Sequence, residues 1–314
     1  MTTIAAAGFD GLLGTVAELR FTTSGVTKVR ESVLAARPLH LASDGGELFV
    51  CLVDDSVVRV RFMESGSHFL ERIELAGLPC HAVVVGNSLV VSLYRAGKIA
   101  FLSLDNSVPV YWRALPPGPR GPSHPHHTEV SPDGEYLIVS DAGADAVAVW
   151  ERAAPHVEIN RVALGEGVGP RNSVFCPSDA SRLFVTGQDD STLREFLWNG
   201  STAALSDSGA WMSSRISGNL PSGIGANDLA VYQANREAGT IAMLPFDSGQ
   251  TILECVSGGW PMAVLTFLHE GDRWCAVALR DFGKVEFRRV DDAGLLGPAL
   301  VKIPIPGAVG LALA

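Results

Sequence analysis

Three histidines stand within four positions of one short stretch, HPHHTEVSPDG (residues 124–134), which ends in a tight-turn signal. An imidazole exchanges protons near neutral pH and is the commonest metal ligand, so this cluster could serve acid–base chemistry or hold a metal ion. Zinc sites usually combine histidines with a carboxylate or a cysteine in register, and the sequence offers no such set here. We therefore expect acid–base chemistry, with no metal and no cofactor.

Residues able to bind or react also recur after prolines that precede apolar runs, namely Pro38, Pro79, Pro125, Pro170, Pro261 and Pro306. The residues directly after them are Leu39, Cys80, His126, Arg171, Met262 and Gly307, and the next ones are His40, His81, His127, Asn172, Ala263 and Ala308. The planar guanidinium of an arginine binds carboxylates and phosphates and stabilises developing negative charge. Whether these side chains meet depends on the elements that carry them.

Those elements are short strands in a repeat. Apolar runs that end in a turn, such as LFVCLVDD and LFVTGQDD, are each followed by a second strand-like run, which gives seven hairpins along the chain. The prolines share the same spacing of about 45 residues, a period typical of β-propellers. One proline is missing from the series, and we expect its position within SGIGANDLAV (residues 222–231), where Asn227 and Asp228 stand instead.

The two ends of the sequence complete each other. The first hairpin, residues 2–21, has no proline strand before it, and the last proline strand, residues 304–314, has no hairpin after it. The first hairpin and the last proline strand would together form one blade. The N-terminal strands would thereby complete the C-terminal blade and close the ring. The predicted fold is all-β, a seven-bladed β-propeller in which residues 1–314 form a single domain.

Composition limits the partners. The net formal charge is −10 and no run is rich in Lys or Arg, which argues against nucleic acid and anionic membranes. No basic region precedes the apolar N-terminal stretch and no apolar run is long enough for a transmembrane helix, so we expect a cytoplasmic protein with no membrane association. Five scattered cysteines without a C-x-x-C pair fit reduced, buried thiols. The expected partner is a small molecule, and the oligomeric state stays unknown.

In a propeller, the innermost strand of each blade runs along the central channel, so residues after the prolines would ring a pocket. Histidines of three consecutive blades and Arg171 of the fourth would converge there. Side chains alternate along a strand, so the first and second residues after each proline would point in different directions, and the sequence leaves open which set faces the channel. His40 and His81 could bond to neighbouring backbone or, with His127 and Asn172, contact a substrate.

The region around the histidines reads GPSHPHHTEVSPDGEYLIVSDAGADAVAVW over residues 121–150. Further along stand GVGPRNSVFCPSDASRLFVTGQDDSTLREF (167–196), ANREAGTIAML (234–244) and GGWPMAVLTF (258–267). These stretches resemble the seven-bladed lactonase propellers, a family that includes bacterial-type 6-phosphogluconolactonases and the fungal carboxy-muconate lactonizing enzyme. The resemblance covers residues 121–290 and reaches the first third of the chain only through the repeat.

The resemblance implies a pocket. Family members build it from the second His of HPH, the Arg of GPR, a Glu in the next hairpin and the Arg of an N-R pair. The matching residues are His126, Arg171 and Arg236, whereas Gln188 stands at the Glu position. An amide forms hydrogen bonds but exchanges no proton at useful pH. The motif of the sixth blade usually begins P-R, and Met262 stands in place of that arginine.

Three functions follow from these residues. The first is a cofactor-free enzyme that opens or closes a lactone or related ring on an oxygen-rich substrate, as a hydrolase, isomerase or lyase, with His126, Arg171, Arg236 and Gln188 at the catalytic centre. The second is a repurposed, non-hydrolytic cyclase or isomerase of secondary metabolism, cycloaddition included, in which Trp260 and Met262 would contact a larger, less charged substrate. The third is a non-catalytic interaction scaffold, which needs no such cluster.

Overall fold

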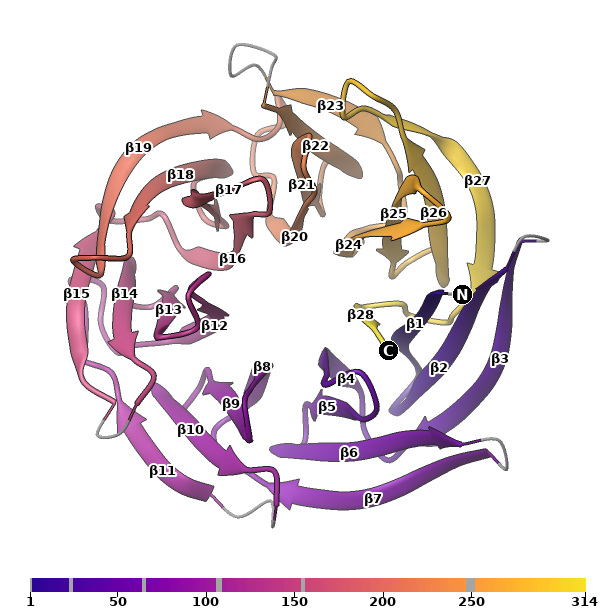
Figure 1. Cartoon of the computed structure of the whole chain (residues 1–314), viewed down its shortest axis with the longest axis horizontal. Coiled ribbons are helices and arrows are strands. Elements are labelled where there is room, and N and C mark those ends of the chain that lie inside the picture. Colours follow the sequence, from indigo (N-terminus) through magenta and orange to yellow (C-terminus); the bar gives the residue numbers. More distant parts are fainter. Residues whose placement is uncertain (1, 23–24, 64–65, 106–108, 154–155, 247–251) are drawn as a thin grey trace.

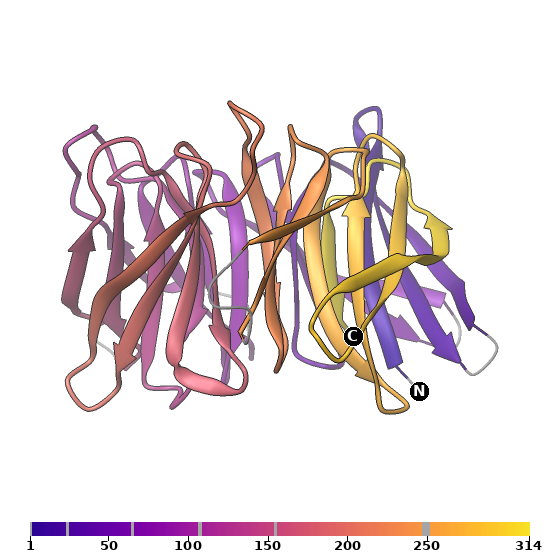
Figure 2. The ribbon, with the colours of Figure 1, turned by 90° about the horizontal axis from the view of Figure 1, so that it is seen from above.

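The chain folds into a closed ring of β-sheets, seen down the ring axis in Figure 1 and from the side in Figure 2. The computed structural model describes residues 2–22, 25–63, 66–105, 109–153, 156–246 and 252–314. These residues form seven four-stranded sheets, the blades, and contain no helix that could span a membrane. The prediction of an all-β, seven-bladed propeller is confirmed.

Six blades take four consecutive strands each, ordered from the channel outward (Figure 1). The first three of them comprise β4 (Pro38–Ser43), β5 (Leu48–Leu52), β6 (Ser56–Met63) and β7 (Gly66–Glu74); β8 (Pro79–Val85), β9 (Ser88–Leu93), β10 (Lys98–Ser103) and β11 (Pro109–Ala114); and β12 (Pro125–Val130), β13 (Tyr136–Asp141), β14 (Ala146–Glu151) and β15 (Glu158–Ala163). The next three comprise β16 (Pro170–Cys176), β17 (Asp179–Gly187), β18 (Thr192–Asn199) and β19 (Ala204–Met212); β20 (Pro221–Ala226), β21 (Ala230–Asn235), β22 (Thr240–Pro245) and β23 (Leu253–Val256); and β24 (Pro261–His269), β25 (Asp272–Leu279), β26 (Lys284–Val290) and β27 (Leu296–Pro304).

The seventh blade closes the ring. It joins the C-terminal strand β28 (Gly310–Leu313), which lies innermost, to β1 (Thr2–Asp10), β2 (Leu13–Thr22) and β3 (Gly25–Leu34). Strand β28 pairs antiparallel with β1, with Ile4 opposite Leu313 and Ala7 opposite Gly310. The two chain ends therefore lie close together, as Figure 1 shows, and the predicted closure by complementary ends is confirmed.

The core lies between neighbouring blades. Because adjacent blades cover both faces of the middle strands, β5 (LFVCL) and β21 (AVYQAN) are buried along their whole length instead of alternating. One cluster joins Phe49 and Cys51 of one blade to Val91 and Ala100 of the next. This packing on both sides fixes the inner strands and therefore the side chains at the channel.

Six of the seven inner strands begin with a proline. The prediction that one proline is missing from the series was wrong. Pro221 begins β20, directly before the segment in which we expected a substitute. Asn227 and Asp228 instead follow β20, where the Asn227 side chain accepts hydrogen bonds from the backbone N–H groups of Leu229 and Ala230. Asparagine forms such turns readily, so the pair marks the end of the strand rather than its beginning.

Candidate functional site

A β-bulge follows the proline of each of these inner strands and decides which side chains reach the channel. The register shifts between Pro38 and His40, Pro79 and His81, Pro125 and His127, Pro170 and Ser173, Pro221 and Ile224, and Pro261 and Ala263. A bulge sets two residues against one on the partner strand and re-aims their side chains. After five of these prolines, both the first and the second residue line the channel, so alternation does not restrict the lining to one set. Gly307 and Ala308, which follow Pro306, are outside the lining.

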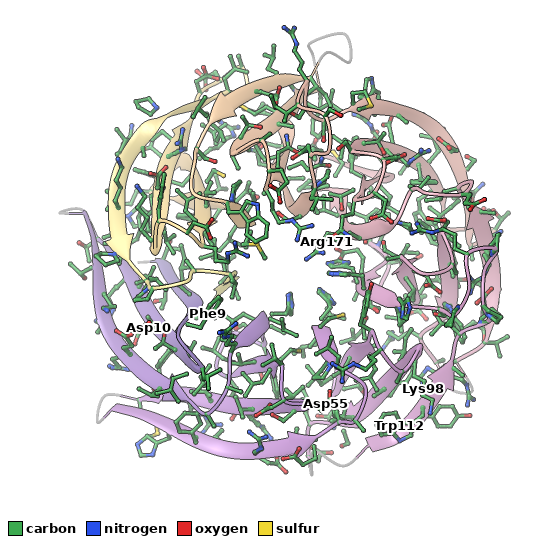
Figure 3. The ribbon with its side chains drawn as sticks, turned by 180° about the vertical axis from the view of Figure 1, so that it is seen from behind. Phe9, Asp10, Asp55, Lys98, Trp112 and Arg171 are labelled. Carbon is green, nitrogen blue, oxygen red and sulfur yellow. The ribbon has the colours of Figure 1, made fainter. Side chains whose placement is uncertain are left out.

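Two cavities meet at this end of the ring. The inner cavity, of about 160 Å³, is lined by Leu39, His40, Cys80, His81, His126, His127, Arg171, Asn172, Gly223, Ile224, Met262, Ala263, Val264, Val309, Gly310 and Leu311. The outer cavity, of about 260 Å³, is lined by Phe9, Arg37, Pro38, Leu39, Val53, Cys80, His126, Arg171, Met262, Arg280 and Val309. The shared walls include His126 and Arg171, which lie at the junction, and Figure 3 shows Arg171 directed toward the central opening.

Three histidine rings of the inner cavity form a stack that crosses from blade to blade. The centroids of His40 and His81 lie 4.1 Å apart, and those of His81 and His127 lie 3.8 Å apart. His40 Nε2 donates to the carbonyl of Ala82 (3.0 Å), and the backbone N–H of Thr128 donates to His81 Nδ1 (3.3 Å). Hydrogen bonding to neighbouring backbone, one of the two predicted roles of His40 and His81, is therefore present, although both rings also line the cavity.

Burial keeps this stack neutral. Desolvation lowers the pKa of His40 to about 4 and that of His127 to about 3, and desolvation together with the neighbouring rings lowers the pKa of His81 well below its usual value. His127 Nδ1 is hydrogen-bonded to Ser173 Oγ at 3.0 Å. The stack therefore contributes polar but uncharged surface to the inner cavity.

His126 differs from the stack. Its Nδ1 is buried and has no hydrogen-bond partner among the described residues. Desolvation and the positive charges of Arg171 and Arg236 lower the pKa of His126 well below its usual value. The ring is therefore unprotonated at neutral pH, as a general base must be, and it lines both cavities.

Gln188 joins the two predicted arginines. Its side-chain oxygen accepts hydrogen bonds from Arg171 Nη1 and from Arg236 Nη2, the latter at 2.8 Å. Burial and the charge of Arg236 lower the pKa of Arg171 to about 9. Both guanidiniums therefore remain charged at neutral pH, yet a neutral amide bridges them. The site carries an excess of positive charge that a glutamate would have reduced.

Asp189 fixes the orientation of this amide. Gln188 and Asp189 lie in the turn after β17, and Gln188 Nε2 donates to Asp189 Oδ1 at 3.3 Å. Asp189 in turn pairs with Arg120 (2.8 Å), which also contacts the buried Asp145 (3.3 Å). With its nitrogen on Asp189, the amide turns its oxygen toward Arg171 and Arg236.

The site includes two arginines that the sequence analysis missed, Arg37 and Arg280, which both line the outer cavity. In the six blades whose inner strand begins with a proline, the first residue after the second strand donates its backbone N–H to the carbonyl of the residue directly before the inner strand. These donors are Val53, Tyr94, Ala142, Gln188, Arg236 and Arg280. Arg280 thus occupies the position of Gln188 and Arg236 one blade further on, and it lines the outer cavity. The hairpin alignment carried this signal, since VTGQ, QANR and VALR end at these three residues.

The remaining predicted residues lie as follows. Met262 lines both cavities and Asn172 lines the inner one. Gln188, Arg236 and Trp260 lie behind the lining rather than in it, within the described part of the chain. The guanidinium carbon of Arg280 lies 3.3 Å from the centroid of a Trp260 ring, and that of Arg236 lies 5.6 Å from it. Trp260 therefore orients two arginines and forms no wall of the cavities.

Metal ligands do not come together in the described residues, where no three His, Cys, Asp or Glu side chains are placed to hold an ion. The histidine rings pack against one another at interplanar angles of 43° and 44°, and each uses one nitrogen for a hydrogen bond to the protein. The donor set therefore does not fit a metal ion.

The seven-bladed ring is the architecture of the lactonase propellers, and the match of the family model over most of the chain shows that the chain belongs to this family. The family described as "Lactonase, 7-bladed beta-propeller" matches residues 13–312. The family resemblance seen in the sequence is therefore confirmed.

Several solved structures share the fold. The periplasmic gluconolactonase PpgL of Pseudomonas aeruginosa superposes with a TM-score of 0.85 at 20% identity, over 99% of this chain and 98% of its own. A Bacteroides fragilis protein provisionally assigned as a 6-phosphogluconolactonase gives a TM-score of 0.86 at 18% identity, over 100% of this chain and 98% of its own. A curated WD repeat-containing protein of Synechocystis is 25% identical over 155 residues, which span 48% of this chain and only 40% of that protein.

Proposed function

We propose that the protein hydrolyses the lactone ring of an oxygen-rich, anionic small molecule, with His126 as general base and Arg171 as the group that stabilises the oxyanion. The observation that carries this proposal is the position of these two side chains. They lie on consecutive inner strands, β12 and β16, and both line the junction of the two cavities. One offers an unprotonated imidazole and the other a guanidinium that is charged at neutral pH.

The reaction needs little else. His126 removes a proton from a water molecule while the water oxygen attacks the lactone carbonyl, and Arg171 donates hydrogen bonds to the carbonyl oxygen as it becomes negative. The bond to the ring oxygen then breaks, and the protonated His126 returns its proton to that leaving oxygen. Water and lactone give one hydroxy acid, and His126 and Arg171 end in their starting states.

The excess positive charge supports an anionic substrate. Arg171 and Arg236 share a neutral partner in Gln188, so a carboxylate or phosphate nearby would supply the missing negative charge. Such an anion would also offset the charge that lowers the pKa of His126. His126 would therefore become a stronger base when the substrate is bound.

Hydrolysis is favoured over the alternatives by the family to which the chain belongs and by the gluconolactonase among its structural neighbours. No comparison reported above favours a cyclase of secondary metabolism. A role as a non-catalytic scaffold does not account for the buried His126 Nδ1 without a partner or for the arginines that Gln188 bridges.

A hydrolysis assay tests the proposal. The purified protein is given sugar lactones with and without a phosphate group, together with muconate-type acids, and acid release is followed. The wild type should hydrolyse at least one anionic lactone, and His126→Gln should lower kcat about 100-fold or more. The matched control is His124→Gln, because His124 stacks on Tyr94 and lines neither cavity. Failure to hydrolyse any lactone, or full activity of a folded His126→Gln variant, would refute it.

A further inference from the structure

Two arginines at the outer cavity have no place in the reaction just described. Arg37 lies directly before β4 and Arg280 directly after β25, and both line the cavity. Each guanidinium lies over an aromatic ring, that of Arg37 at 4.8 Å from the centroid of Phe9 and that of Arg280 at 3.3 Å from Trp260. Stacking holds a guanidinium flat and leaves its edge free to bind a planar or tetrahedral anion.

The hydrogen bonds of these arginines leave their outer nitrogens available. Arg37 donates through Nε to the carbonyl of Gly11 at 2.6 Å, and Arg280 donates through Nε to Asp281 at 2.7 Å. Neither side chain makes another hydrogen bond within the described residues. Four N–H-bearing nitrogens are thereby left for a ligand, two from each arginine.

Charge in the outer cavity is one-sided. Three arginines and His126 line it, and no described lining residue is an aspartate or a glutamate. Asp281, which lies outside the lining, pairs with Arg280 Nε at 2.7 Å. The other lining residues are Phe9, Pro38, Leu39, Val53, Cys80, Met262 and Val309. A cavity with apolar walls, three lining arginines and no lining carboxylate suits an acidic group on an otherwise weakly polar part of a ligand.

We propose that Arg37 and Arg280 form an outer subsite that binds an acidic group of the substrate remote from the lactone carbonyl. This inference rests on the proposed function for the position of the carbonyl, at His126 and Arg171. The preferred substrates then carry a carboxylate or phosphate at the end opposite the reacting ester. The acidic group would then lie in the outer cavity, and the reacting ester would lie at the junction of the outer and inner cavities.

The arrangement also accounts for Met262. This residue replaces the arginine expected after the proline of the sixth blade, and it gives that wall of both cavities an apolar surface. The same blade returns a guanidinium to the outer cavity from a different position, Arg280 in the turn after β25. In this blade the positive charge therefore lies at the outer cavity and not at the inner one.

The backbone around Trp260 is shaped to hold Arg280 in place. Trp260 has a left-handed φ of 55°, which is unfavourable for a bulky residue and occurs where the surroundings enforce it. The preceding Gly258 and Gly259 also have positive φ, and a Cβ on Gly259 would come within 2.5 Å of the Phe282 ring. This strained turn presents the indole to Arg280 before any ligand binds, which lowers the entropy lost on binding.

A binding experiment tests the subsite without relying on catalysis. Affinities for 6-phosphogluconate, glucarate and gluconate are measured by calorimetry for the wild type and for Arg37→Gln, Arg280→Gln and Arg280→Lys. The first ligand carries a remote phosphate, the second a remote carboxylate and the third neither. The matched control is Arg95→Gln, which removes an exposed arginine from the equivalent end of the ring that lines neither central cavity.

The wild type should bind 6-phosphogluconate or glucarate about tenfold or more tightly than gluconate, as expected for a charge-assisted pair. Arg280→Gln and Arg37→Gln should each remove most of this preference while gluconate affinity stays the same. Arg280→Lys should retain part of it because charge remains but the planar stack is lost. Which acid is preferred distinguishes a phosphate from a carboxylate as the natural group.

Two results would overturn the subsite. One is a preference for the remote acid that survives both glutamine variants in folded protein, and the other is equal binding of all three acids by the wild type. Failure of the proposed hydrolysis gives a different pattern, in which no lactone is opened but the affinity difference and its dependence on Arg280 persist.

Discussion

The two sides of the channel use the same backbone framework for different purposes. On the histidine side, which we define as His40, His81 and His127, each ring crosses to the next blade and bonds to its inner strand. On the arginine side, defined as Arg171, Arg236 and Arg280, the side chains gather around an amide and an indole, and the amide that Arg171 and Arg236 share is neutral. Each histidine is thus hydrogen-bonded to a neighbouring blade, whereas Arg171 and Arg236 share a partner that carries no negative charge.

This difference shows that lining a cavity is not enough to identify a catalytic group. His81 and Arg171 both lie at the channel, but the nitrogen of His81 is already engaged by the backbone of Thr128. His126 belongs by chemistry to the arginine side, since its Nδ1 has no protein partner and its pKa responds to the arginines. The stack joins neighbouring inner strands, whereas His126 and Arg171 are the groups that we propose act on the substrate.

The largest expected effect separates the two sides by activity. Arg171→Gln should lower kcat/KM about 100- to 1,000-fold, the usual cost of losing a donor to a developing oxyanion. His81→Gln should leave kcat/KM within about threefold, because the ring does not touch the reacting atoms. Steady-state kinetics on the best lactone substrate decides the matter. A loss in His81→Gln as large as that in Arg171→Gln would place the stack in the reaction.

The second effect concerns stability, and it should come from the histidine side. His81 and His127 are buried and neutral when folded, with the pKa of His127 lowered to about 3. Below about pH 6.5 these histidines are protonated in the unfolded chain but stay neutral in the folded chain. Their contribution to the free energy of unfolding is therefore full above that pH and decreases as the pH falls. Each such histidine should lower the free energy of unfolding by about 1.4 kcal/mol per pH unit, over a range that reaches about pH 3 for His127.

Urea unfolding at pH 7, 6 and 5 measures this slope directly. Between pH 6 and pH 5, the free energy of unfolding of His127→Asn should fall less steeply than that of the wild type, by about 1.4 kcal/mol per pH unit. This difference should hold whatever the stability of the variant at pH 7. An identical slope in variant and wild type would mean that His127 is protonated in the folded state, and the stack would then carry charge.

The sequence carried most of the fold and part of the site. The regular hairpins and the complementary ends were sufficient to predict seven blades and the closing strand, because each blade repeats the same pattern of apolar strands and turns. His126 and Arg171 line the channel end where the repeat placed them, and Arg236 contacts Gln188 outside the lining; their roles stay predictions. The sequence could not predict that Gln188 bridges Arg171 and Arg236, because these two hydrogen bonds join residues of separate blades.

Three further features could not be predicted because they depend on local backbone geometry or on the position of one residue in its blade: the bulges, Arg280 and the orientation of Trp260. Strict alternation predicts that adjacent residues point apart, but the bulge after each proline brings both to the channel, and a bulge leaves no clear mark in these strands. Arg280 was overlooked because the proline register directed attention to Met262 of the same blade. Trp260 was expected to form a wall, but its left-handed backbone turns the indole toward the arginines.

The smallest effect tests whether the unpaired charge of the arginine side is functional. In Gln188→Glu a carboxylate would sit between Arg171 and Arg236, raise the pKa of Arg171 and cancel one positive charge near the cavity. The affinity for anionic ligands should then fall about three- to tenfold, since one charge-assisted contact must compete with an internal pair. Gln188→Met, which changes no charge, is the matched control and should weaken binding less. A gain of lactone hydrolysis in Gln188→Glu over the wild type would contradict this account, because it would mean that the reaction needs a carboxylic acid and that the native amide suppresses it.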